Sequence, residues 1–407
     1  MAQIGTREQR HVVAACYLGW SLDAFDYFIM AFALDDVAAS FHSTRAAVSW
    51  AFTLTLAMRP LGALVFGRLA DRFGRRPTLM ANVLIYSVLE GLSGLAPTLA
   101  SFLVLRAMFG FAMGGEWGVG ASLTMESIPA RWRGPVSGLL QAGYPTGFLL
   151  ATLLNRAAVA QVGWRGLFFL GVLPALLVLY IRRSVPESPD WQAGQGTARP
   201  GVINVLQHHW RLALYAVVMM AAFNMFSHGT QDLYKSFLAH DHGLPLATTT
   251  WILIAMNVAA MLGGITVASL SQLFGRRRAI VTAALCALPV IPLWAFAQDP
   301  LWIAAGAFLL QLCVQGAWGV IPAHLNELSP AEARATFPGV TYQLGNLLAS
   351  GTAPLQTGLA VAFFHDNLSW PLALVTGVVA LAIAVLVGYG REARDVRMGR
   401  DRLSAAA

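Results

Sequence analysis

The sequence predicts an all-α membrane protein whose twelve transmembrane helices form two pseudo-symmetric six-helix halves. The 407 residues are 57% hydrophobic and only 12% charged, whereas an ordinary soluble domain carries about 25% charged residues. A helix needs about 20 mainly apolar residues to cross a bilayer, and such windows recur along the whole chain. They lie near residues 12–34, 46–67, 79–98, 101–123, 135–158, 163–181, 212–238, 248–270, 279–298, 301–323, 337–361 and 370–390.

An internal repeat divides these spans into two sets of six. At an offset of 201 residues, several separate segments of the chain match one another. The matching residues are Leu69, Phe73, Gly74, Arg75 and Arg76 with Leu270, Phe274, Gly275, Arg276 and Arg277, and Trp117, Gly118, Val119, Glu126, Pro129, Arg133 and Gly138 with Trp318, Gly319, Val320, Glu327, Pro330, Arg334 and Gly339. The sequence therefore predicts halves over residues 1–181 and 211–390, a cytoplasmic linker over 182–210 and a cytoplasmic tail over 391–407. Parallel repeats of this kind place their substrate site between the halves, near the middle of the bilayer.

The basic residues give the expected orientation in the membrane. With both termini in the cytoplasm, all but six of the 27 lysines and arginines fall on the cytoplasmic side. The exceptions are Arg45, Arg59, Arg106, Arg156, Arg165 and Lys235. This positive-inside bias accounts for the net charge of +7 without a nucleic-acid partner, and it predicts a multi-pass protein of a bacterial inner membrane.

Several kinds of site are not expected. Cys16, Cys286 and Cys313 are far apart in apolar segments, so neither a disulfide framework nor a metal site is indicated. Because no phosphate-binding loop or nucleophile triad is evident, we expect no cofactor, no enzymatic activity and transport driven by a gradient. The N-terminal segment leads into a full-length span and lacks the short apolar region and cleavage site of a signal peptide.

A stripe of polar side chains interrupts the span expected over residues 212–238. Its members, Asn224, Ser227, His228, Gln231, Asp232 and Lys235, recur at helical spacing and so share one face. Because hydrocarbon cannot satisfy such groups, this face predicts a substrate or ion path. His228 and Asp232 could form a contact that tunes the imidazole for a proton relay. The alternative for the same residues is a packing network between helices.

Ionisable side chains also lie within the spans of the first half. They are Asp23 and Asp26 in the first span, Arg59 in the second, Glu90 in the third, and Arg106 and Glu116 in the fourth. A bare charge there costs at least about 2.5 kcal/mol, so these groups must pair, take up protons or be hydrated. The second half carries Ala307 and Ala317 in place of the last two. We therefore expect the first half to carry more of any ion coupling.

Each of these groups has a functional and a structural interpretation. Asp23 and Asp26 are either proton-coupling acids or members of structural ion pairs, and Glu116 is either a second proton site or a partner for a neighbouring helix. Arg59 either holds a substrate carboxylate, which suits the guanidinium geometry, or serves in packing or gating. Glu90, near a helix end, is expected to be solvated.

The chain resembles the major facilitator superfamily over its whole length. Three segments carry the resemblance: Gly67-Arg-Leu-Ala-Asp-Arg-Phe-Gly-Arg-Arg76 between the second and third spans, Arg106-Ala-Met-Phe-Gly110 with Gly114 and Gly115 in the fourth, and Pro186-Glu-Ser-Pro-Asp-Trp191 after the sixth. The stretch from Asn224 to Asp232 is similar to the helix-seven motif of the lactate/pyruvate permeases in the sialate:proton symporter family. It departs from that motif at Lys235, where the motif has Pro, and at Ser236, where it has Thr.

The resemblance implies a proton-coupled symporter for a small organic carboxylate, with lactate-like acids first and a larger acid second. By similarity to proton-coupled sugar porters, Asp26 and Arg106 would form the proton switch. Asn224, Ser227, His228, Gln231 and Asp232 would contact substrate. A monomer is usual for this family, with lipid, a carboxylate and protons as its partners.

The resemblance also implies a cytoplasmic gate. Asp71 with Arg72, Arg75 and Arg76 would form a charge relay that latches the halves in the outward-facing state. The second copy has Gln272 in place of Asp71, so the latch is expected to be asymmetric. Trp20, Trp117 and Trp318 lie on spans at the repeat interface, where they either shape the cavity or pack. A proton-driven exporter of acids or drugs, a ligand sensor and a membrane enzyme are the rival functions.

Overall fold

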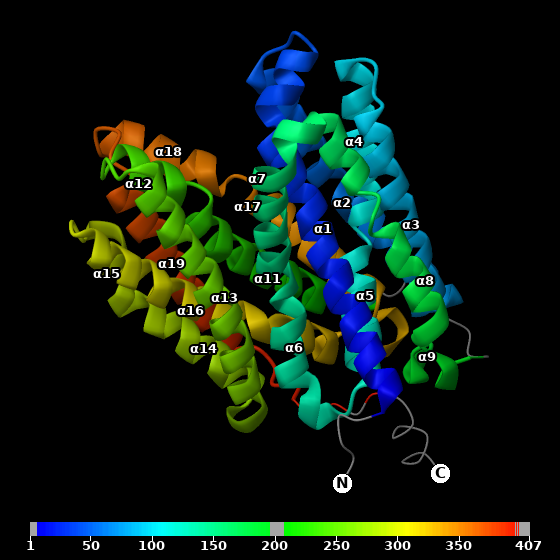
Figure 1. Ribbon diagram of the computed structural model, residues 1–407. Coiled ribbons are helices and arrows are strands. Elements are labelled where there is room, and N and C mark those ends of the chain that lie inside the picture. Colours follow the sequence, from blue (N-terminus) through cyan, green and yellow to red (C-terminus); the bar gives the residue numbers. More distant parts are fainter. Residues whose placement is uncertain (1–5, 196–206, 395, 397, 399–407) are drawn as a thin grey trace.

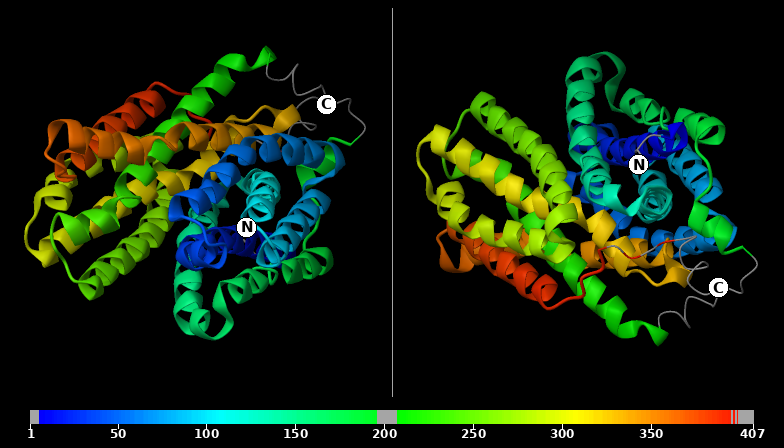
Figure 2. Two further views of the ribbon diagram at one scale, coloured as in Figure 1. Left: turned by 90° about the horizontal axis from the view of Figure 1, so that it is seen from above. Right: turned by 90° about the horizontal axis from the view of Figure 1, so that it is seen from below.

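The computed structural model describes residues 6–195 and 207–394 together with residues 396 and 398, and it is helical throughout these residues (Figure 1). The first half contains α1 (Arg7–Ser40), α2 (Arg45–Phe73), α3 (Arg75–Gly94), α4 (Leu99–Met113), α5 (Glu116–Ser127), α6 (Arg133–Gln141), α7 (Gly143–Leu170) and α8 (Ala175–Ser184). The second contains α11 (Trp210–Gln231), α12 (Tyr234–His240), α13 (Leu246–Phe274), α14 (Arg276–Ala287), α15 (Ile291–Phe296), α16 (Pro300–Leu328), α17 (Thr336–Ala349), α18 (Thr352–Phe363) and α19 (Ser369–Gly388). Seen from above and from below, the two sets of helices form two bundles side by side (Figure 2).

Within the described residues, nine helical segments are long and apolar enough to span a membrane. The remaining expected spans correspond to α3, to the pair α6 and α7, and to the pair α17 and α18. These three are more polar or are interrupted, which is why length and composition alone do not select them. The expected linker contains a short helix, α9 (Pro189–Ala193), while residues 196–206 and most of the tail lie outside the described residues.

The two copies of the repeat found in the sequence form equivalent contacts in the structure. Arg75 lies 2.9 Å from Glu126 in the first half, and Arg276 lies 3.0 Å from Glu327 in the second. The helices before these arginines end on glycines with positive φ, 112° at Gly74 and 97° at its repeat mate. A side chain is strained in that conformation, so both copies keep glycine. The α2–α3 turn and the α13–α14 turn are therefore built in the same way.

Small residues set the distance between α2 and α4. A Cβ at Gly110 would lie 2.2 Å from the Thr55 carbonyl oxygen, and one at Gly114 would lie 2.1 Å from the Arg59 carbonyl oxygen. The glycines of the fourth span thus allow close backbone approach. They hold the helix that carries Arg106 directly against the helix that carries Arg59.

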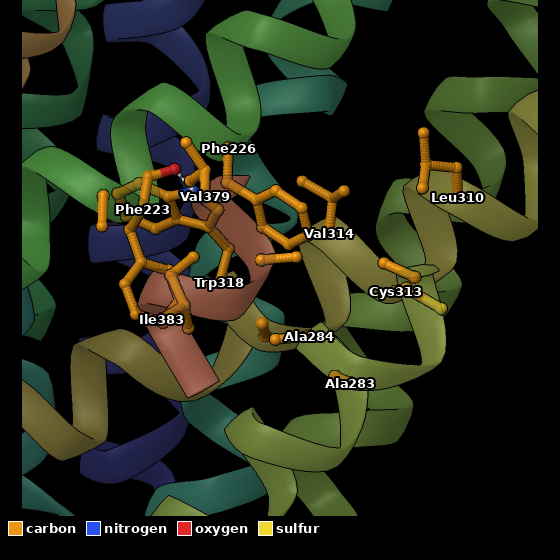
Figure 3. Close-up of a cluster of buried hydrophobic side chains, with 14 of the residues drawn as sticks. Phe223, Phe226, Ala283, Ala284, Leu310, Cys313, Val314, Trp318, Val379 and Ile383 are labelled. Carbon is orange, nitrogen blue, oxygen red and sulfur yellow. Dashed lines mark hydrogen bonds between the residues drawn. The ribbon is translucent and has the colours of Figure 1, made fainter. Parts of the chain in front are cut away.

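Each half has a packed apolar core. In the second half, Phe223 of α11, Trp318 of α16 and Ile383 of α19 lie in one buried cluster (Figure 3). The Trp318 indole donates a hydrogen bond of 2.9 Å to the Phe223 carbonyl oxygen, which satisfies its polar atom inside the core. This packing fixes α11 against α16, and so positions the polar stripe of α11.

Contacts between the halves bring pseudo-symmetric residues together. α2 packs against α17, and α6 packs against α13 and α16. A Cβ at Gly118 would lie 2.7 Å from the Gly339 Cα atom. The repeat mates of these two glycines, Gly319 and Gly138, also lie near each other. Ser137, which directly precedes Gly138, donates a hydrogen bond of 2.6 Å to the Gly319 carbonyl oxygen. The halves therefore meet through equivalent surfaces.

Candidate functional site

Polar side chains of α11 face an internal space between the halves. The side chain of His228 is 33% exposed and that of Asp232 is 44% exposed, although the His228 ring lies deep within the protein. A side chain that lies far from the outer surface and is still partly accessible to solvent lines an internal space that water can reach. Arg59 of the first half acts electrostatically on His228, and Asp232 acts on Tyr27 and Tyr144. The space is therefore bounded by both halves.

The predicted contact between His228 and Asp232 is present. The imidazole Nδ1 lies 3.1 Å from an Asp232 carboxylate oxygen, and Nε2 lies 3.0 Å from the Asn346 side-chain oxygen on α17. Both ring nitrogens are thus held, one within the same helix and one across helices. The ring has a fixed orientation toward the internal space.

Two other stripe residues, Ser227 and Gln231, are tied to α16. Gln315 donates a hydrogen bond of 2.9 Å to the Ser227 hydroxyl, and Gln231 donates one of 3.1 Å to Gln311. Asn224 is buried and donates to the Met220 carbonyl oxygen of its own helix at 2.8 Å. Ser227 and Gln231 are partly exposed, so they combine a packing network with access to the internal space.

The span expected over residues 212–238 is confirmed as one membrane-spanning segment, Trp210–His240. A short turn interrupts it, because α11 ends at Gln231 and α12 begins at Tyr234, and Lys235 lies beyond this turn. The physical reason is an inserted side chain. Gln356 of α18 donates a hydrogen bond of 2.8 Å to the Gly229 carbonyl oxygen, which takes an acceptor from the helical ladder.

Arg59 has no anionic partner in the described part of the chain. Its side chain is buried, its Nε atom has no hydrogen-bond partner, and no carboxylate lies within ion-pair distance. Its guanidinium contacts the Met113 sulfur and lies 5.4 Å from the centre of the Tyr27 ring. Asp23 interacts with it electrostatically from a greater distance. A buried cation without an anion is costly, so this position suits an anion supplied from outside.

A cluster of four acids lies behind Arg59. Asp23, Asp26, Glu90 and Glu116 interact electrostatically with one another, and all four are almost completely buried. Asp26 has no hydrogen-bond partner for either carboxylate oxygen among the residues described. Among the described residues, the guanidinium groups of Arg59 and Arg106 interact with this cluster, so the four acids outnumber the two cations.

One expectation for this cluster is wrong, and one stays a prediction. In this structure Arg106 pairs with Glu90, at 2.6 Å, and its expected exchange with Asp26 remains a prediction. Glu90 is not solvated but is 0% exposed. The reason is packing: α3 lies between α4 and α7, so its end is covered. Gly171 touches both acids, since a Cβ there would lie 2.4 Å from Glu90 Cγ and 3.0 Å from an Asp26 carboxylate oxygen. Asp26 and Glu90 are therefore neighbours, and Arg106 is bonded to one of them.

Glu116 packs against α1, where a Cβ at Gly19 would lie 2.5 Å from its carboxylate oxygen. A small cavity beside it is lined by Cys16, Trp20 and Trp117, among others. The cavity has space for about one water molecule. Glu116 therefore lies beside α1 and this cavity, and it has no part in the Arg106–Glu90 ion pair.

Aromatic rings from both halves pack together where the halves meet. Tyr342 of α17 lies 6.5 Å from Trp20, 4.6 Å from Trp117 and 5.8 Å from Trp318, measured between ring centroids. Trp117 and Trp318 are repeat mates, so the two halves contribute equivalent rings on either side of one tyrosine. These tryptophans lie where the halves meet, as the sequence predicts.

Below the rings, Asp71 joins the halves. Its carboxylate accepts hydrogen bonds from the backbone N–H groups of Ala335 and Thr336, each at 3.1 Å, and from the Thr336 hydroxyl at 2.6 Å. It also lies 3.2 Å from Arg75. A carboxylate at the start of α17 is favoured by the helix dipole. Arg334 of the second half lies 2.7 Å from Asp190 of α9, which adds a second bond across the halves.

The other predicted gate arginines do not cross the interface. Arg72 lies over the Phe73 ring, and Arg76 donates to the Arg182 carbonyl oxygen within the first half. In the second copy, Gln272 accepts a hydrogen bond of 3.2 Å from the Gly134 N–H. The latch is asymmetric in charge, because a neutral amide stands where the first copy has a carboxylate, but both copies bridge the halves.

The comparisons with known proteins agree with this architecture. The sequence profile of the Major Facilitator Superfamily matches residues 16–233 and 217–402. The chain belongs to the major facilitator superfamily. It is 27% identical to the sialic acid transporter NanX of Escherichia coli, covering 94% of each chain. It is also 27% identical to a carboxylic acid transporter protein homolog of Saccharomyces cerevisiae, covering 93% of this chain and 68% of that one.

A solved structure has the same fold. The proton:xylose symporter XylE, bound to 6-bromo-6-deoxy-D-glucose, aligns with a TM-score of 0.81 at 18% sequence identity, covering 98% of this chain and 99% of the other. As a major facilitator superfamily member, the chain is a multi-pass membrane protein and a secondary transporter, not an enzyme. Within the described residues, no group of histidine, cysteine and acidic side chains has the arrangement of a metal site.

Sequence reasoning missed four residues of this site. Tyr144, Tyr342, Asn346 and Gln315 bound the space or hold stripe residues. They are uncharged and lie on helices without a family motif, so no spacing pattern marked them. Gln315 and Asn346 could have been found by the stripe argument, because each is an amide within an apolar span.

Proposed function

We propose that the protein is a proton-coupled symporter of a small organic carboxylate, with lactate- and pyruvate-like acids as its first substrates. One observation carries the proposal: Arg59 is a buried guanidinium without an anionic partner in the described chain, and it lies at a water-accessible space beside buried acids that require protons. An anion and a proton are the two species that would satisfy these groups together.

The substrate carboxylate would bind Arg59. A guanidinium stays charged and offers paired N–H donors to a carboxylate. Ser227, His228 and Gln231 face the same space from the other half and would contact the rest of the substrate, with Asn224 and Asp232 at the two ends of this stripe. Binding would therefore involve both halves, as alternating access around a central site requires.

The proton would be carried by the acid cluster. Asp26 has no partner for its carboxylate, and Arg106 is held by neighbouring Glu90. If Arg106 moves from Glu90 to Asp26 when the halves rearrange, the approaching guanidinium favours the ionised form of Asp26 and releases its proton. Asp23, near Arg59, would link this exchange to substrate binding, and Glu116 would be a second proton site.

The gate would be the cytoplasmic contact. Asp71 and Arg75, with the Arg334–Asp190 pair, hold the halves together below the aromatic rings. Arg72 and Arg76 would act within the first half. Release of substrate to the cytoplasm requires these bonds to break, so the described arrangement corresponds to a state closed to the cytoplasm.

The helix-seven motif supports membership in the sialate:proton symporter family, and NanX is a relative with a sialic acid substrate. The bias of basic residues supports a position of both termini in the cytoplasm. The relative YhjE of Escherichia coli, an inner membrane metabolite transport protein, supports a bacterial inner membrane. We propose a monomer that works as two halves, over residues 1–181 and 211–390, joined by the linker.

Purified protein in liposomes tests the proposal. With the lumen alkaline, labelled lactate should accumulate, and an imposed voltage should change the rate little, because a monoanion and one proton carry no net charge. Preloaded lactate should drive counterflow. If none of a panel of small monocarboxylates competes for binding or shows counterflow, the proposal is wrong.

A larger aromatic acid is the second candidate substrate. Rings form a continuous series beside Arg59: Phe28 lies 5.5 Å from Tyr27, 5.5 Å from Tyr144 and 4.8 Å from Phe148, between centroids. These side chains are partly exposed, and aromatic faces pack well against a planar substrate. In the same competition panel, benzoate or nicotinate displacing lactate at lower concentration would favour this candidate.

A further inference from the structure

One cavity of the described structure lies away from the central space, at the cytoplasmic end of the second half. It has a volume of about 840 Å³ and is open to the outside. It is bounded by the turn from α13 to α14 and by the end of α19. This turn lies at the same end of the molecule as the start of α1 (Figure 1). The lining is Leu273, Phe274, Gly275, Arg277, Arg278, Val281, Thr282, Gly388, Glu392 and Arg394, and we call this cavity the α13–α14 groove.

The groove combines apolar surface at the end of a membrane span with positive charge just beyond it. Leu273 and Phe274, the last residues of the α13 span, are 71% and 61% exposed. Three arginines follow or face them, against one acid, Glu392. The Glu392 carboxylate is occupied by the backbone N–H groups of Arg276, Arg277 and Arg394. The groove therefore presents net positive charge at the level of the lipid headgroups.

One of its arginines is available for a ligand. Arg277 is held by the Val387 and Gly388 carbonyl oxygens at the end of α19. Arg394 donates to the Gln272 and Leu273 carbonyl oxygens, at 3.2 and 2.9 Å. Arg278 is exposed and forms no hydrogen bond or ion pair within the described chain, although it lines the same groove. Two cations are thus fixed in place, and the third can turn toward an anion.

The internal repeat shows what is special about this place. In the first half, the Trp191 indole of α9 donates a hydrogen bond of 3.0 Å to the Asp71 carbonyl oxygen. Asp71 and Gln272 are repeat mates, and each has a carbonyl oxygen that accepts a hydrogen bond. In the first half the donor is the Trp191 indole of α9, and in the second half the donor is the Arg394 guanidinium. The equivalent turn thus carries a helix in one half and a basic groove in the other.

We propose that the α13–α14 groove binds an anionic phospholipid of the cytoplasmic leaflet, with the phosphate at Arg277 and Arg278 and an acyl chain along Leu273 and Phe274. Basic pockets between transmembrane helices on the cytoplasmic side suit anionic headgroups, and the exposed apolar pair suits a chain that remains in the bilayer. A soluble anion would use the arginines but would leave the apolar pair unused.

Native mass spectrometry of the full chain in mild detergent tests this inference, with phosphatidylglycerol and phosphatidylcholine of identical chains. We expect retention of one phosphatidylglycerol in preference to phosphatidylcholine. Arg278→Gln, which breaks no internal bond, should weaken that retention about fivefold, the effect of one surface arginine on an anionic lipid. Arg183→Gln removes an exposed arginine on the same membrane side of the first half and should leave it unchanged.

Three results would overturn the inference. The first is equal retention of phosphatidylglycerol and phosphatidylcholine, and the second is an equal loss of phosphatidylglycerol retention in Arg278→Gln and Arg183→Gln. The third is displacement of the lipid by inorganic phosphate at low millimolar concentration, which would make the groove a site for soluble anions. None of these results depends on transport, so they are independent of the proposed symport.

Discussion

The Arg106 guanidinium lies 2.6 Å from the Glu90 carboxylate, while neighbouring Asp26 is buried without a hydrogen-bond partner among the described residues. One cation therefore has two acids within its reach. Removing one acid should let Arg106 turn to the other, whereas removing both would leave a buried charge without a partner, which costs about 3–5 kcal/mol.

This arrangement predicts non-additive stabilities. Glu90→Gln and Asp26→Asn should each reduce the thermal stability of the purified protein modestly. The double variant should lose more than the sum of the single losses, by about 1–3 kcal/mol. Thermal and denaturant unfolding in detergent measure the three values. Additive losses would show that Arg106 does not exchange between the two acids.

Asp26→Asn should abolish accumulation driven by a pH gradient and spare exchange of labelled for unlabelled substrate. The amide fixes the neutral state, so the halves can still rearrange with substrate, but no proton is released. Uptake and exchange in proteoliposomes measure the two activities. Asp36→Asn removes an exposed acid of the same helix and should leave both unchanged. Intact concentrative uptake by the Asp26 variant would remove this residue from the coupling mechanism.

Arg59→Lys should weaken carboxylate binding about tenfold or more. The variant keeps the charge but loses the paired donors of the guanidinium, and each lost charge-assisted hydrogen bond is worth about 1.5–3 kcal/mol. Competition binding with lactate measures the change. Arg45→Lys, on the same helix but on the outer surface in contact with Asp35, provides the matched control. Equal affinities for wild type and Arg59→Lys would assign Arg59 to packing.

Asp71→Asn should shift the protein toward the cytoplasm-open state. The carboxylate accepts three hydrogen bonds at the start of α17, and the amide has only one accepting oxygen. Tyr342 lies among the aromatic rings between the halves. In a Tyr342→Cys background, the rate at which a thiol reagent labels this position from the cytoplasmic side should increase. Arg72→Gln changes a charge in the same turn without a contact across the halves and should not alter the labelling rate. Equal rates in wild type and Asp71→Asn would exclude the latch.

The sequence predicted the architecture because hydropathy and the 201-residue offset are properties of the chain itself. It also indicated that Asp71 joins the halves, which its bonds to Ala335 and Thr336 show. The binding roles of Arg59 and of the α11 stripe stay predictions. The partner of Arg106 could not be predicted. Asp26 and Glu90 are both acids on neighbouring helices, and only the packing of α3 against α4 and α7 decides between them.

The break in α11 was hidden for a similar reason. It depends on Gln356, which is 127 residues away from Gly229 in the chain, and no local pattern announces a side chain inserted from another helix. The turn at residues 232–233 is therefore set by a contact that is distant in the sequence, and Lys235 lies beyond it.

Asp190 predicts a dependence of the cytoplasmic contact on pH. Burial, and secondarily the charge of Glu126, raise the pKa of Asp190 to about 6, although Arg334, Arg133 and Arg75 oppose this shift. When the halves separate, hydration should return its pKa toward the ordinary value near 3.8. The closed state then binds the proton more tightly than the open state does. Closure is therefore favoured as pH falls from about 6 toward 4, and it is opposed as pH rises through that window.

In inside-out vesicles, labelling of the cysteine introduced at Tyr342 should slow at low pH on this account. The control is Asp190→Asn, which retains the shape of the side chain but cannot titrate. The contribution of Asp190 is the difference between the pH profiles of the labelling rate for the wild type and for this variant. We expect this contribution to be about threefold to tenfold. Other titrating groups act equally in both profiles and cancel in the difference. Identical profiles for the two proteins would show that the Asp190–Arg334 pair does not respond to pH. A difference of opposite sign would show that the attraction of ionised Asp190 to Arg334 stabilises the closed state by more than the burial of its charge destabilises it.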